Sequence, residues 1–178
     1  YLNTYLPEDI RVLDAEETDE KFHSRLNAAG KLYRYRVWTG EKRPVFQRRY
    51  LYGLGKSLDV QAMKQAAELL VGTRDFRSLC ANRRMKQSTV RTLFSIDFRQ
   101  QGEELAMEFY GDGFLYHMVR ILAGTLIEVG EGKRPPESVT DILEAKNRQA
   151  AGFTAPAEGL CLVRVDYGTA KAGKRRWQ

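Results

Sequence analysis

The 178-residue sequence predicts an α+β domain, with a mainly antiparallel sheet and helices packed on one face of that sheet. Two observations carry this prediction. Apolar and polar residues alternate on both sides of a short turn at residues 101–103, which is typical of a β-hairpin. Apolar residues with helical spacing precede and follow the hairpin, and this mixture favours an α+β domain over a doubly wound sheet. A chain of this length can also bury one sizeable core.

Two strands are expected before the first long helix. Residues 10–15 have the apolar character of a short strand. Residues 32–38 alternate, so that Tyr33 and Tyr35 face one side while Arg34 faces the other. The second segment is therefore expected to form a half-buried strand with one basic face.

A capped helix and the hairpin follow. Ser57 or Asp59 can cap a helix whose apolar residues recur with helical spacing up to Val71, and Gly72 suits its end. The first hairpin strand is expected to place four side chains on one face: Val90, Phe94, Ile96 and Phe98. The second hairpin strand repeats the period of two with Leu105, Met107 and Phe109.

The run over residues 113–130 is apolar on all sides but carries an arginine, Arg120, in its interior. Such a helix is expected to be buried, and a buried arginine needs a partner anion. That partner is either Asp112 or Glu128, in a purely structural role, or an acid in a catalytic site. Charged residues interrupt the run too often for it to span a bilayer, and Gly130 is expected to end the helix.

A second helix is expected to start near Pro135 and to run to about Lys146. An irregular loop and a strand over residues 160–167 follow it. Residues 1–168 are therefore expected to form the domain. The basic residues 169–178 form a tail, which is more typical of a frayed end than of an RNA contact.

Composition limits the possible partners. The 29 basic and 23 acidic residues give a formal charge of +6 and a pI near 9.4, which favours polyanionic partners without identifying one. Cys80 and Cys161 lack metal-ligand spacing and are expected to be buried thiols of a reducing compartment, which favours the cytoplasm. The sequence predicts no transmembrane helix, no metal site and no nucleotide cofactor.

Seven short motifs occur in the order in which one protein family has them. The longest is Gly113-Phe114-Leu115-Tyr116-x-Met118-Val119-Arg120-x-x-x-Gly124-Thr125-Leu126. The others are Leu6-Pro7-Glu8-Asp9-Ile10, Phe22-His23-Ser24-Arg25, Lys31-Leu32-Tyr33-Arg34-Tyr35, Gly72-Thr73-Arg74-Asp75-Phe76, Thr154-Ala155-Pro156-Ala157 and Val165-Asp166-Tyr167. Together they resemble the tRNA pseudouridine synthase A family from one end of the chain to the other.

The resemblance implies an enzyme that isomerises uridine to pseudouridine at positions 38–40 of the tRNA anticodon stem-loop. It also implies a homodimer that shares one tRNA between its subunits and needs no metal or cofactor. The family's nucleophilic aspartate lies in a Gly-Arg-Thr-Asp-x-Gly-Val-His-Ala-like loop upstream of the Leu-Pro-x-Asp-Ile motif, and this sequence has no such loop. The chain therefore resembles the C-terminal part of the family and is expected to be inactive alone. Asp75 lies at a turn that is not the catalytic position.

The matched motifs imply roles for five residues. Arg120 is expected to hold the missing aspartate ionised and oriented. Tyr33 resembles the tyrosine that stacks on the target base and whose hydroxyl assists proton transfer, although its strand pattern by itself is typical of ordinary core. Leu160 or Leu162 resembles the apolar residue beside the aspartate. Arg25 is expected to contact phosphate.

Basic residues interleaved with aromatic residues are expected to bind the tRNA backbone. This prediction concerns clusters, because an individual lysine or arginine is more often a solvated charge. The first cluster comprises Lys31, Arg34, Arg36, Arg43, Arg48 and Arg49. The second cluster comprises Arg83, Arg84, Lys86 and Arg91.

Two other interpretations stay open. The chain could be a non-catalytic RNA-binding module that keeps the basic sheet. It could also be a protein-interaction domain whose apolar helix pairs with another chain. The last interpretation predicts no affinity for tRNA, so RNA binding at varied salt separates it from the others.

Overall fold

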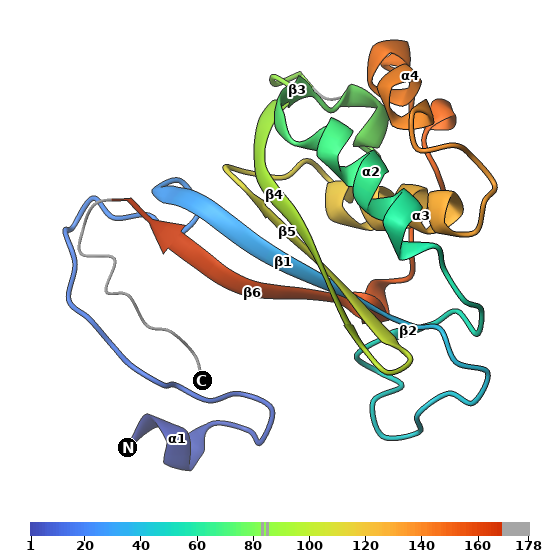
Figure 1. Ribbon diagram of the computed structural model, residues 1–178. Coiled ribbons are helices and arrows are strands. Elements are labelled where there is room, and N and C mark those ends of the chain that lie inside the picture. Colours follow the sequence, from blue (N-terminus) through green and yellow to red (C-terminus); the bar gives the residue numbers. More distant parts are fainter. Residues whose placement is uncertain (83, 85, 169–178) are drawn as a thin grey trace.

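The computed structural model describes residues 1–82, 84 and 86–168, and within them it confirms the predicted α+β class (Figure 1). Three helices cover one face of a six-stranded sheet. The strands are β1 (Ala28–Trp38), β2 (Tyr52–Gly53), β3 (Gly72–Asp75), β4 (Val90–Gln101), β5 (Glu104–Gly111) and β6 (Leu160–Tyr167). The helices are α1 (Leu2–Tyr5), α2 (Val60–Leu70), α3 (Met118–Gly130) and α4 (Ser138–Ala145). The predicted tail and Arg83 lie outside the described residues.

The sheet is mainly antiparallel, as predicted. Its order is β2-β1-β5-β4-β3, and β6 pairs with β1 over Ala28 to Tyr35 on the edge that β2 uses further along the strand. The short β1–β2 pair is parallel, and the other pairs are antiparallel. Figure 1 shows that α2, α3 and α4 cover the end of the sheet that contains β3 and β4, whereas β1 and β6 extend beyond the helices.

The hairpin of β4 and β5 is confirmed, but one prediction about its faces is wrong. Gly102, with φ +57°, lies in the turn between the two strands. Residue 94 is an extra residue in β4, because the pairing with β5 shifts between Leu93 and Ser95. This bulge reverses the phase of the strand, so that Leu93 is buried while Val90 and Phe94 are each 46% exposed. Ile96, by contrast, packs against the core as predicted.

Helix α2 begins and ends where the sequence indicates. The Asp59 carboxylate caps it by accepting a 3.0 Å hydrogen bond from the backbone N–H of Ala62. The helix ends at Leu70, and Gly72 adopts φ +105°, a conformation that favours glycine. The helix buries Met63, Ala66, Ala67 and Leu70, which form one face as expected.

Helix α3 is buried on nearly all sides but starts later than expected. It begins at Met118 rather than at residue 113, and His117 before it is left-handed with φ +60°. The backbone N–H of Ala81 donates to the carbonyl of Tyr116 at 3.0 Å, so this carbonyl bonds to a residue outside the helix. The helix ends at Gly130 as predicted.

The prediction of a strand over residues 10–15 is wrong. The segment has no regular secondary structure, and it pairs with no strand in the described part of the chain. The Asn3 side chain both donates to and accepts from the Val12 backbone at 2.8 Å, which ties α1 to this segment. Apolar character without a neighbouring strand edge was not enough to form a strand. Figure 1 shows this N-terminal segment apart from the sheet.

The remaining elements follow the expected order. Helix α4 lies within the predicted helix, and Lys146 ends it in the left-handed region with φ +47°. An irregular loop leads to β6, whose bounds agree with the prediction. Among the described residues, no helix is long and apolar enough to cross a membrane.

Candidate functional site

Arg120 lies on α3, where a loop fixes its side chain. Its Nε donates a 2.6 Å hydrogen bond to the carbonyl of Ala155. The backbone N–H of Ala155 in turn donates to the carbonyl of Arg120 at 3.0 Å. The arginine is half-buried, not fully buried as predicted. One edge of the guanidinium is therefore anchored by backbone.

Close packing holds this loop against α3. A Cβ on Gly124 would lie 2.0 Å from the carbonyl oxygen of Phe153, so only glycine permits this approach. The Thr125 hydroxyl accepts a 3.0 Å hydrogen bond from the N–H of Gly152, and the Glu128 carboxylate accepts one of 3.1 Å from Phe153. The loop that positions Arg120 is thus joined to the same helix at three successive points.

Neither structural partner considered for Arg120 takes that role. Glu128 instead pairs with Arg134 at 2.7 Å and holds the loop, while Asp112 accepts a 3.0 Å hydrogen bond from the N–H of Thr92. No carboxylate of the described residues lies within ion-pairing distance of Arg120. Its terminal N–H groups can therefore donate hydrogen bonds to an anion from outside this set of residues.

Tyr33 and Tyr35 share one face of β1 but have different surroundings. Tyr35 is fully buried, and its hydroxyl donates to the carbonyl of Pro156 at 2.7 Å. Burial first, and then the charge of Glu158, raise the pKa of Tyr35. Tyr33 is only half-buried, and its ring meets Phe114 edge-on at 5.2 Å between centroids. Tyr33 is therefore the tyrosine that a ligand can reach.

The two predicted leucines lie beside these tyrosines on β6. Leu160 is the register partner of Tyr35, and Leu162 is the register partner of Tyr33. Since cross-strand partners share a face, both leucines lie on the helix-covered side of the sheet. Leu160 packs against the core, whereas Leu162 is 48% exposed. Leu162 and Tyr33 together form an accessible apolar surface.

Lys31 and Arg34 lie on opposite faces of β1. Lys31 alternates in phase with Tyr33 and so shares its face. Arg34 lies on the other face, where it pairs with Glu108 at 2.6 Å. Arg99 approaches the same carboxylate at 3.3 Å. The structure thus brings Lys31 to the side of Tyr33 but places Arg34 in an ion-pair cluster behind the sheet.

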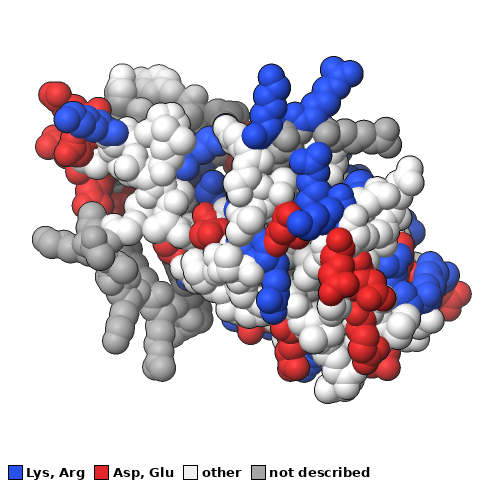
Figure 2. Space-filling model, turned by 90° about the horizontal axis from the view of Figure 1, so that it is seen from above, with Lys and Arg blue, Asp and Glu red and all other residues white. Residues whose placement is uncertain are grey.

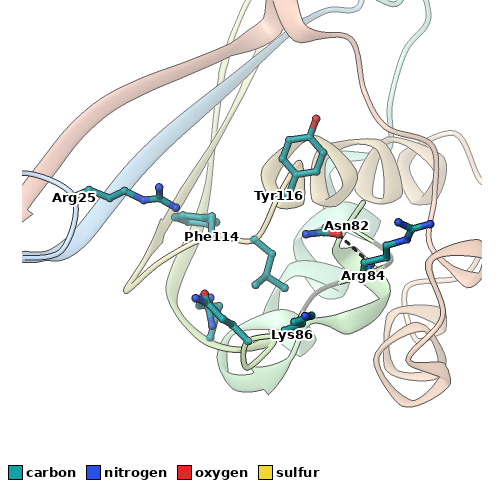
Figure 3. A pocket seen from close by; sticks show the side chains of 9 residues that line it. Arg25, Asn82, Arg84, Lys86, Phe114 and Tyr116 are labelled. Carbon is teal, nitrogen blue, oxygen red and sulfur yellow. Dashed lines mark hydrogen bonds between the residues drawn. The ribbon is translucent and has the colours of Figure 1, made fainter.

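Arg25 lies at a hollow of about 440 Å³, which is also lined by Phe114, the ring partner of Tyr33 (Figure 3). It reaches in from the segment before β1 toward Phe114, while Asn82 and Arg84 come from the opposite side. Further lining residues come from the second predicted basic cluster. The lining comprises Arg25, Asn82, Arg84, Lys86, Gln87, Arg91, Phe114, Leu115 and Tyr116.

The aromatic residues before α3 were not predicted as site residues. Tyr116 is 61% exposed, and its ring stacks on His117 at 3.9 Å between centroids. Desolvation first, and then the positive charge of Arg120, lower the pKa of His117. Gly113 could have indicated this, because a glycine at the start of the apolar run is compatible with a turn, and a turn there makes the helix begin later. The connection to Arg120 depends on tertiary structure and has no sequence signal.

The two cysteines have different surroundings. Cys80 is buried as expected, but Cys161 is exposed on β6, so its predicted burial is wrong. The described residues contain no cluster of histidine, cysteine and carboxylate side chains that could hold a metal ion.

Figure 2 shows lysine and arginine side chains projecting from one rim of the molecule and continuing toward its middle.

Comparison with known proteins places the chain in a family. Residues 66–168 match the family model described as tRNA pseudouridine synthase. The tRNA pseudouridine synthase A of Geobacillus kaustophilus is 47% identical over 166 residues, which cover 93% of this chain and 64% of that protein. The Bacillus subtilis protein of the same name is 48% identical over 166 residues, covering 93% of this chain and 67% of that protein. The chain belongs to the tRNA pseudouridine synthase family, and it spans about two thirds of the length of these relatives.

Proposed function

We propose that this chain is the C-terminal part of a tRNA pseudouridine synthase that isomerises uridines 38–40 in the anticodon stem-loop. The names of its relatives support the reaction and the tRNA substrate. The observation that carries the proposal is the guanidinium of Arg120, which is anchored at Nε and has no carboxylate partner among the described residues. The terminal nitrogens of this guanidinium can pair with a catalytic carboxylate.

The reaction breaks the bond between uracil and ribose, turns the base and rejoins it through carbon. It requires a nucleophilic carboxylate, a group that keeps this carboxylate ionised, and a surface that holds the detached base. The guanidinium of Arg120 lowers the pKa of an adjacent carboxylate and orients it through its terminal nitrogens. Arg120 is thus proposed to keep the nucleophile charged and aimed at the nucleotide.

Tyr33 is proposed to hold the base. Its accessible ring offers a stacking surface, and Leu162 across the strand pair extends this surface. The Tyr33 hydroxyl is proposed to move a proton to or from the turned base. Lys31, on the same face of β1, adds a cation for the phosphate backbone.

The nucleophilic aspartate is proposed to come from the part of the family sequence that this chain does not align with. Asp75 is a poor substitute because its carboxylate already accepts hydrogen bonds from the Thr89 hydroxyl and the Arg77 backbone. Those bonds, with the Thr89 bond the largest cause, lower the pKa of Asp75 and fix it at the end of β3. The family resemblance also supports a cytoplasmic homodimer that shares one tRNA between its subunits.

A tritium-release assay tests this proposal. The substrate is an anticodon stem-loop with labelled uridines, incubated with this chain and with a version extended through the Gly-Arg-Thr-Asp-like segment of the family. We expect turnover with the extended version only. Turnover with the chain as printed would show that the nucleophile lies in this chain, and it would contradict the proposed origin of the aspartate. Absence of turnover with both would contradict the proposed enzyme.

A further inference from the structure

The hollow beside Phe114 has the composition of a binding site for an anionic, aromatic ligand. Among the described residues that line it are the cations Arg25, Arg84, Lys86 and Arg91, and none of these described lining residues is a carboxylate. Its volume of about 440 Å³ lies in the range of small-ligand pockets. Cations gathered without compensating acids repel one another, and an anion between them removes that cost.

Arg91 is held in place in this hollow. Its Nη1 donates to the carbonyls of Ser88 and Val90 at 3.0 and 2.6 Å, so part of the guanidinium is anchored by its own strand. Arg74 of β3 is its register partner in the sheet, which places two arginines directly opposite each other. Like charges in this arrangement are destabilising, so the pair is not explained by stability of the sheet.

Tyr116 supplies an exposed ring at the same hollow. Its ring stacks on the imidazole of His117 with an interplanar angle of 23°, which leaves the opposite ring face open. Figure 3 shows Tyr116 at the start of α3, with its ring pointing away from Lys86 on the far side of the hollow. An exposed ring beside several cations is the combination with which proteins hold single-stranded nucleotides.

We propose that this hollow binds a nucleotide adjacent to the uridine being modified, with its phosphate among the arginines and its base on Tyr116. Phe114 connects the hollow to the site because it lines the hollow and also touches Tyr33. The inference rests on the proposed tRNA substrate. It adds that recognition includes a second, splayed-out base rather than backbone charge alone.

The test is a double-mutant cycle, in which RNA affinity is measured for each combination of protein variant and modified RNA. The probe is the anticodon stem-loop, used intact and in versions that are abasic at one loop position at a time. Tyr116→Ala is expected to weaken binding of the intact RNA by about 5- to 100-fold. At one abasic position, Tyr116→Ala should weaken binding no further, because the stacking partner is already missing. Tyr116→Phe keeps the ring and should bind like the parent chain.

The phosphate contact is tested by charge removal. Arg25→Gln and Arg91→Gln should each weaken binding and lower the slope of log affinity against log salt by about one. Lys64→Gln is the matched control, because Lys64 is an exposed cation on α2 and does not line the hollow. It should leave the slope nearly unchanged. Unfolding midpoints of all variants check that each one folds.

Two results would overturn the inference. The first is that Tyr116→Ala weakens binding of every abasic RNA as much as it weakens binding of the intact RNA. The second is that Lys64→Gln changes affinity and salt slope as much as the two arginine substitutions do. If either occurs while the parent chain binds the stem-loop tightly, the proposed function stands and only the hollow is misassigned. If the parent chain does not bind the stem-loop, both the hollow and the proposed tRNA substrate are wrong.

Discussion

The two ends of the sheet differ in how they are covered. Where α2, α3 and α4 cover the sheet, side chains such as Leu93 of β4 and Leu126 of α3 are fully buried. Where β1 and β6 extend beyond the helices, Leu162 and Val163 are 48% and 42% exposed. Strands pair at both ends, and the pairing is irregular at both: β4–β5 shifts register between Leu93 and Ser95, and β1–β6 shifts twice. The difference in exposure therefore lies in the layer above the sheet. The covered end buries apolar area, which stabilises the fold, and the open end keeps apolar area for a ligand or partner.

The candidate site lies at the border between these two ends. Arg120 projects from the buried helix, while Tyr33 and Leu162 belong to the open strands. A rigid helix can position a charge accurately, and an open sheet face admits a base. At the border, a charge held by the stable end therefore lies next to a sheet face that a base can reach. Substitutions on the two sides should therefore affect different measurements.

The largest expected effect is on turnover. Arg120→Ala in the chain that carries the family aspartate should lower the rate of pseudouridine formation by about 10²- to 10³-fold, because the nucleophile loses its charged partner. Affinity for the stem-loop should remain near that of the parent. Arg120→Lys should recover little, since lysine lacks the planar group that bonds Ala155 and a carboxylate together. Turnover near the parent rate would remove Arg120 from the proposed mechanism.

The second largest effect is on the free energy of unfolding, which should differ between the covered and the open end. Leu126→Ala on α3 should lower the free energy of unfolding by about 2 to 5 kcal/mol, because it leaves a cavity in the core. Leu162→Ala on the open end should cost less than about 1 kcal/mol. Urea denaturation of the two variants measures the difference. Equal losses would mean that the open end is buried in solution, against a partner or a second copy.

The smallest effect concerns pH. The pKa of His117 is depressed in the folded chain, first by desolvation and then by Arg120, so folding favours its neutral form. Its stabilising contribution is present above the ordinary pKa of about 6.5 and is lost as the pH falls through the depressed folded value. NMR titration of the imidazole should find this low pKa, and Arg120→Ala should raise it only in part. An unchanged pKa in that variant would place the guanidinium away from His117.

The sequence predicted the features that depend on local chemistry. The Asp59 cap and the hairpin turn at Gly102 were found because a carboxylate or a glycine at one position is sufficient to specify them. The bulge at residue 94 was missed because its phase is decided by the pairing with β5, not by the residues of β4. The matched motifs predicted Arg120 and Tyr33 as site residues.

The environment of those two residues could not be predicted in the same way. The carbonyl of Ala155 that orients Arg120 is 35 positions away and belongs to an irregular loop, so no periodicity marks it. The contact between Tyr33 and Phe114 joins β1 to the turn before α3. Such contacts arise from packing between distant segments, and one sequence carries no direct record of them.

We propose that Arg120 serves a ligand from the border of the two ends and does not hold the fold together. The most direct test is the free energy of unfolding of Arg120→Ala in the chain as printed. We expect a change below about 1 kcal/mol, because the lost hydrogen bond to Ala155 is offset by removing a half-buried charge that lacks a carboxylate partner among the described residues. A loss of about 3 to 5 kcal/mol, as for an arginine taken from a buried ion pair, would contradict the claim.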